Sequence, residues 1–117
     1  MLDNLPIPKS TKDSLTYDEQ VDIIDAVQAM PGAWFVDIDE SPYGDSYACL
    51  IPPWSDGLMS AFLIERQSEV VVLTDRLSNE VRDIVTTCSS VAEAMAVVVA
   101  TVAGTAVSRP AAMRKTS

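Results

Sequence analysis

Between residues 33 and 75 the chain contains four strand-like segments whose connections are too short to return in parallel. In residues 33–40, apolar and acidic side chains alternate, as they do in a strand with one buried face. A parallel return needs about a dozen residues or more, and usually a helix, which these connections do not supply. The pattern therefore predicts an antiparallel meander with strands in residues 33–40, 46–51, 61–66 and 69–75.

A helix is predicted before this block. Thr16 is a good N-cap residue, and Glu19 follows three residues later, which makes a capping box. Apolar residues then recur at helical spacing, and the Met30-Pro31-Gly32 sequence ends the helix. Asp18, Asp22 and Asp25 fill its opposite, solvated side.

Residues 77–89 are compatible with two structures. Ser78 could cap a helix, but residues 81–88 are rich in β-branched side chains, which favour a fifth strand. We expect the strand, because Ser90 and Glu93 form a second capping box just beyond it. The following helix should extend to about Ala103, with Gly104 as its C-terminal cap.

The fold class that follows is α+β: a two-layer domain with a helix, a four- or five-stranded antiparallel meander and a second helix. We assign this single domain to residues 16–104. Residues 1–15 should form an extended N-terminal arm, and residues 105–117 a flexible basic tail.

The last helix is unusually apolar, with no charge between Ala94 and Val107. This run is shorter than the roughly 20 residues of a membrane span, so we expect no membrane anchor. Small residues recur every fourth position, at Ala92, Ala96, Ala100 and Gly104. We expect this ridge to pack closely against a neighbouring element of the domain.

The third and fourth strands are apolar on both faces, in residues 61–64 and 70–73. A sheet with one solvated face should alternate, and two short helices cover only one face. A second copy of the chain, the N-terminal arm or a partner protein should therefore cover the other face.

The composition and charge of the chain exclude or disfavour several functions. The chain has no histidine, so catalytic triads and histidine-bound zinc are excluded. Its 17 acids and 8 bases leave a net charge of −9, which disfavours direct binding to nucleic acid. The first 93 residues carry −12 and the remainder +3, an acidic body with a basic end.

The two cysteines, Cys49 and Cys88, do not form a Cys-x-x-Cys pair. The first residues lack the basic and apolar regions of a signal peptide, so we expect a cytoplasmic location. Two reduced, buried thiols fit that compartment better than a disulfide does.

Four carboxylates lie around the first predicted hairpin, at Asp37, Asp39, Glu40 and Asp45. A calcium loop starting at Asp37 would place Pro42 and Ala48 where glycine and glutamate are needed, so a solvated strand end is the preferred interpretation. Trp54 follows two prolines in a loop and is either an interface anchor, joined by Tyr43, or a cap over the end of the sheet. The predicted partner-binding residues are Trp54, Tyr43, Asp37, Asp39, Glu40 and Asp45.

We therefore expect a small, acidic, non-enzymatic protein-binding module of chaperone or adaptor type, with no cofactor. It should act as a homodimer through apolar sheet or helix surface and bind another protein of basic character. The alternative is an acidic inhibitor or immunity protein, whose carboxylates imitate phosphates and block a basic nucleic-acid-binding protein or toxin. In size, charge and layer order the chain is similar to secretion chaperones and to toxin-immunity or phage inhibitor proteins, without a shared motif.

Overall fold

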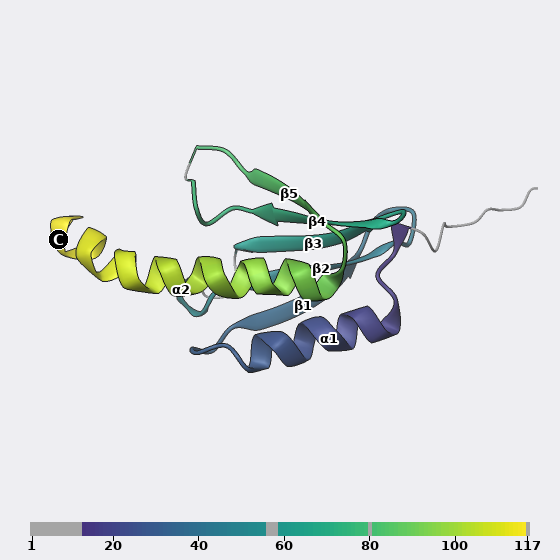
Figure 1. Ribbon diagram of the computed structural model, residues 1–117, viewed down its shortest axis with the longest axis horizontal. Coiled ribbons are helices and arrows are strands. Elements are labelled where there is room, and N and C mark those ends of the chain that lie inside the picture. The colour runs from purple at the N-terminus through teal and green to yellow at the C-terminus, as the bar shows by residue number, and fades with distance from the viewer. Residues whose placement is uncertain (1–12, 56–58, 80, 117) are drawn as a thin grey trace, which may run out of the picture.

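A computed structural model describes residues 13–55, 59–79 and 81–116 (Figure 1). It confirms the α+β class and the order helix, antiparallel meander, helix, with five strands. A short 3₁₀ helix, η2 (Pro53–Ser55), follows the second strand. The main elements are α1 (Tyr17–Gln28), β1 (Phe35–Glu40), β2 (Ser46–Ile51), β3 (Phe62–Gln67), β4 (Val70–Asp75), β5 (Ile84–Cys88) and α2 (Val91–Thr116).

The strands form one sheet in the order β1-β2-β3-β4-β5, and every neighbouring pair is antiparallel. The ambiguous segment is confirmed as a strand, since β5 pairs with β4 from Val71 opposite Cys88 to Asp75 opposite Ile84. The tight turn between β3 and β4 places Ser68 at a φ of 61°, a conformation that L-residues seldom adopt.

The predicted capping box at the start of α1 is present. The Thr16 N–H donates to Glu19 Oε1 at 2.9 Å, and the Glu19 N–H donates to Thr16 Oγ1 at 3.1 Å. At the start of α2, the Glu93 N–H donates to Ser90 Oγ at 3.1 Å, while the Glu93 carboxylate accepts from the Ser89 N–H. Both helix starts are therefore fixed by contacts within a few residues of sequence.

The predicted end of the second helix is wrong. α2 continues through Gly104 and Pro110 to Thr116, and its C-terminal end projects past the sheet in Figure 1. Alanine, the strongest helix former, recurs throughout this region, and a single glycine costs a helix only about 1 kcal/mol. Whether residues 105–117 move independently, as predicted for a flexible basic tail, stays a prediction.

Both helices lie on the same side of the sheet, where the core forms (Figure 1). Alternate strand residues point into this core, and the residues between them point to the other face of the sheet. Trp34, Val36 and Ile38 pack against its margin. Its buried members include Ala48, Leu50, Phe62, Ile64, Val71, Leu73 and Cys88 from the strands and Ile23, Val27, Ala94, Met95 and Val98 from the helices.

Candidate protein-docking surface

The second face of the sheet, here called the open face, is covered by neither α1 nor α2 (Figure 1). One row of register partners crosses all five strands on this face. Each member alternates with a neighbour that points into the core. The row is Asp37, Cys49, Leu63, Thr74 and Val85.

The apolar part of the open face accounts for the excess hydrophobicity of β3 and β4. Leu63, Val70 and Val72 alternate with the core residues of the same strands. Towards the middle, Cys49 and Val72 are each 9% exposed, whereas Phe35 and Val85 at the two edges are 59% and 63% exposed. The middle of the face is therefore already buried, and its accessible apolar side chains lie at the two edges.

The charged strand residues of the open face are all acidic. Asp37 and Asp39 project from β1, and Glu65 projects from β3 in the same phase as Leu63. The strands contribute one basic residue, Arg66, whose side chain lies on the helix side and pairs with α1. The strands of the open face therefore combine apolar side chains with carboxylates, and Arg76, just beyond β4, lies close enough to lower the pKa of Cys49 on this face.

These carboxylates affect neighbouring groups. Burial raises the pKa of the Tyr47 phenol, and the carboxylate of its register partner Asp39 adds to this effect. Burial also raises the pKa of the Cys49 thiol, with Asp37 and Asp39 contributing in the same direction. Both groups therefore keep their protons at neutral pH, and the thiol is a poor nucleophile.

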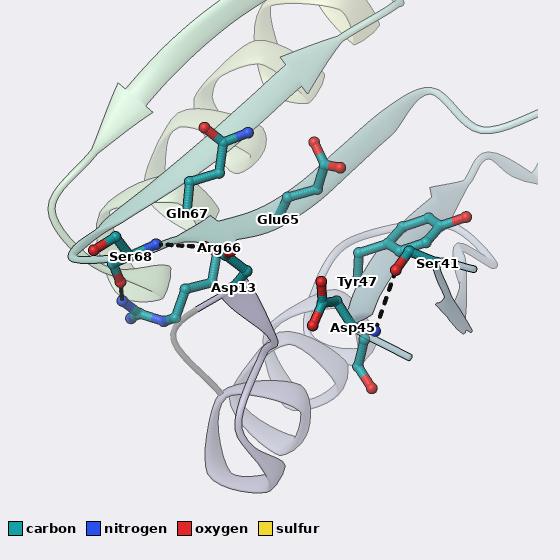
Figure 2. A pocket seen from close by; sticks show the side chains of 9 residues that line it. Asp13, Ser41, Asp45, Tyr47, Glu65, Arg66, Gln67 and Ser68 are labelled. Atoms are coloured by element: carbon teal, nitrogen blue, oxygen red, sulfur yellow. Dashed lines mark hydrogen bonds between the residues drawn. The ribbon is translucent and has the colours of Figure 1, made fainter. Parts of the chain in front are cut away.

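A polar hollow of about 540 Å³ lies at the hairpin-turn end of the sheet (Figure 2). Arg66 and Ser68 gather on one side of it, and Ser41, Asp45 and Tyr47 on the other. Tyr47, Glu65 and Gln67 also belong to the open face, so the two surfaces are continuous. Asp13, Ser41, Asp45, Ser46, Tyr47, Glu65, Arg66, Gln67 and Ser68 line the hollow.

The hollow has an acidic lining because its one arginine is already engaged. Arg66 donates from Nε to Glu19 at 3.1 Å and from Nη1 to the Ser68 carbonyl at 2.9 Å. Asp13 accepts from the Ser68 N–H at 3.0 Å. Asp45 Oδ1 is buried and has no hydrogen-bond partner among the described residues. A donor group could satisfy that oxygen only after the side chains around it move, because the oxygen itself is buried.

The described residues include no cluster of three or more Cys, Asp or Glu side chains arranged to hold a metal ion. Cys49 and Cys88 are both free and buried, as expected from the sequence. They belong to opposite faces, because Cys49 lies on the open face and Cys88 in the core.

The structure brings together only some of the predicted partner-binding residues. Asp37 and Asp39 lie on the open face, and Asp45 lines the adjoining hollow. Glu40 is exposed at the end of β1, in phase with Ile38 and so directed to the helix side. Tyr43 is 81% exposed in the turn between β1 and β2.

Trp54 lies at the other end of the β1–β2 hairpin from Tyr43, because Phe35 pairs with Ile51 there. Its ring meets the ring of Trp34 in a T-shaped arrangement with centroids 5.6 Å apart, and it stays 49% exposed. Trp54 thus packs against a residue at the core margin while keeping half of its surface accessible. Its role in partner binding stays a prediction.

Sequence reasoning identified a second apolar face in residues 61–64 and 70–73, which include Leu63 and Val72, but missed its other members, among them Tyr47 and Glu65. The signal was present as alternation: residues two apart on a strand share a face. Which of the two faces the helices cover depends on packing between distant elements, which alternation does not encode.

The small-residue ridge of α2 does not pack closely within the domain, contrary to expectation. Ala92, Ala96, Ala100 and Gly104 are all exposed, and a side chain added at Gly104 would meet nothing within 4 Å. The helix uses its opposite side, with Ala94 and Val98, to cover the sheet. Among the described residues, no helix combines the length and apolarity needed to cross a bilayer.

The chain matches no family model, no curated protein and no solved structure in the comparisons with known proteins.

Proposed function

We propose that this chain is a non-enzymatic protein-binding module whose open face receives a basic segment of another protein. One observation carries the proposal: the strands of the open face combine apolar side chains that are accessible at both edges, Phe35 and Val85, with three carboxylates and no strand base on this face. The exposed apolar edges supply contact area, and Asp37, Asp39 and Glu65 favour lysine or arginine at the rim of the incoming segment.

The acidic hollow extends this surface. Asp45 Oδ1 lacks a hydrogen-bond donor among the described residues, and Asp13 and Glu65 add negative charge around it. A lysine or arginine side chain at one end of the bound segment would pair with Asp13 and Glu65 and reach Asp45 Oδ1 once the side chains around it move. The hollow would then fix the register of the segment along the face, as an anchor pocket does in other interfaces.

A second copy of the chain is a poor occupant for this face. Two open faces in contact would bring Asp37, Asp39 and Glu65 of each copy into one interface, with no strand base on this face to neutralise them, while the nearby Arg76 is paired with Asp83. Buried like charges cost several kcal/mol. The charge of the face therefore favours a different protein with a basic surface.

The side chains also favour binding over catalysis. The chain has no histidine, and burial raises the pKa of both thiols. Neither thiol therefore has an imidazole base or a lowered pKa to activate it.

Imitation of phosphates, the alternative function, has no contact in its favour. The exposed acids of α1, Asp18, Asp22 and Asp25, lie in the helix layer, whereas Asp37 and Asp39 lie on the opposite face of the sheet. A single basic groove would not reach both sets at once.

Titration of the ¹⁵N-labelled chain with a short peptide of alternating leucine and lysine tests the proposal. Such a peptide presents one apolar and one basic side when extended. We expect amide shifts centred on Leu63, Val72 and Tyr47, which weaken as salt is added. A peptide of alternating leucine and glutamate is the matched probe and should leave these amides unchanged.

Two charge variants distinguish the open face from general acidity. Asp37→Asn/Asp39→Asn should raise the Kd for the basic peptide about tenfold, from two lost charge contacts. Asp18→Asn/Asp22→Asn removes the same charge from exposed positions on α1 and should leave the Kd within about twofold. Equal weakening by both variants, or shifts centred on α1, would refute the open face as the site.

A further inference from the structure

The two edges of the sheet differ in charge. β1, at one edge, carries Asp37, Asp39 and Glu40 among its six residues. β5, at the other edge, carries no charged residue. Charged side chains on an edge strand prevent pairing with another strand, and β5 lacks this protection.

β5 also has the exposure expected of a pairing edge. Within the described sheet it pairs with β4 alone, so its other side presents unpaired backbone groups. In Figure 1 it forms the outer edge of the sheet, and both helices lie away from its outer side. Ile84 and Val85 are 40% and 63% exposed, and Val81 before the strand is 90% exposed.

We infer that β5 pairs antiparallel with β5 of a second copy, which joins the two sheets into one. Charge selects this edge, because two chains that each carry −9 repel wherever acidic surfaces meet. Residues 76–90 contain two arginines and two acids and are the least acidic border of the sheet. Arg76 and Asp83 also lie 3.7 Å apart, in the loop before β5.

The sequence of β5 suits pairing with itself. A two-fold axis at Thr86 would place Val85 opposite Thr87 of the second copy and Ile84 opposite Cys88. No like charges meet in this register, and β-branched cross-strand pairs favour it. The dimer goes beyond the proposed function and does not depend on it, because the open faces of both copies stay available to partners.

Light scattering on a size-exclusion column, over micromolar to submillimolar loading, tests the inference. The wild type should show a mass near twice 12.6 kDa at the upper concentrations. Val85→Lys should raise the dimer Kd at least about tenfold, because a lysine at a pairing edge must lose its hydration. Phe35→Lys is the matched control, since Phe35 is similarly exposed at the β1 edge, and it should leave the Kd unchanged.

A wild type that stays monomeric over this range overturns the inference, as does a dimer that survives Val85→Lys. Loss of the dimer in Phe35→Lys also overturns it, because the β1 edge or the open face would then hold the copies together. If Val85→Lys is unfolded by circular dichroism, hydrogen exchange of the wild type decides: β5 amides should gain protection as concentration rises. Constant protection refutes the pairing. None of these results bears on the peptide titration of the open face.

Discussion

Glu19 at the start of α1 and Arg66 on β3 form a part-buried ion pair that ties the helix layer to the sheet. The same carboxylate completes the capping box by accepting from the Thr16 N–H. The hydrogen bond from Arg66 lowers the pKa of Glu19, and the contacts with Thr16 lower it further. One side chain therefore caps a helix and joins it to the core layer.

Glu19→Gln should lower the free energy of unfolding by about 1–3 kcal/mol at pH 7. Glutamine preserves the capping box, so the loss reports the charged contact with Arg66. A lowered pKa in the folded state contributes stability above the unfolded-state pKa, and this contribution disappears as pH falls through the folded value, below 4.5. Urea unfolding from pH 7 to 3 should therefore show the difference between wild type and variant shrinking with acid. An equal difference at both ends would contradict the assignment.

Substitutions of Phe62 and Phe35 test which face of the sheet carries the hydrophobic core. Phe62 is fully buried, and its ring lies 6.0 Å from that of Trp34, whereas Phe35 is 59% exposed on the open face. Phe62→Ala should cost about 3–5 kcal/mol in the free energy of unfolding, and Phe35→Ala less than about 1 kcal/mol. Urea unfolding measures both. A large loss for Phe35→Ala would show that the open face is covered within the single chain.

Ser68→Gly should stabilise the protein by about 0.5–1 kcal/mol, because glycine adopts a φ of 61° without strain. The contacts of Ser68 with Asp13 and Arg66 use its backbone N–H and C=O, so the substitution preserves them. Thermal unfolding measures the gain. Glu69→Gly, in the same turn, is the control and should not stabilise.

The thiols of Cys49 and Cys88 should react slowly with a disulfide reagent in the folded protein. Burial raises the pKa of each, so little thiolate is present at neutral pH. In urea, both should react at least about a hundredfold faster as exposure and ordinary pKa values return. Rapid reaction of one thiol in the native state would show that its face opens to solvent.

Local signals predicted most of the secondary structure. The capping residues Thr16 and Glu19 lie within one turn of each other, so the helix start depends on neighbours alone. The hairpins could be predicted equally well, because alternation and short connections determine antiparallel order. The β-branched run before Ser89 correctly indicated β5.

Long-range packing determined what the sequence could not show. Asp37 and Asp39 were identified as candidate site residues, but their alignment with Leu63 and Val72 depends on the register of three strand pairs. The contact of Trp54 with Trp34 joins residues on either side of a hairpin. The end of α2 was misplaced because Gly104 can cap a helix or continue one, and the residue alone does not decide.

The carboxylates of β1 also limit how many copies of the chain can assemble. A sheet with unprotected strands at both of its edges lets copies of a chain add without limit, which leads to fibres. Here only one edge lacks charge, and the other repels any strand that carries the same acids. Pairing through β5 would occupy the one uncharged edge of each copy. Both edges of the joined sheet would then be β1 strands, which carry carboxylates. Assembly of this chain would therefore stop at two.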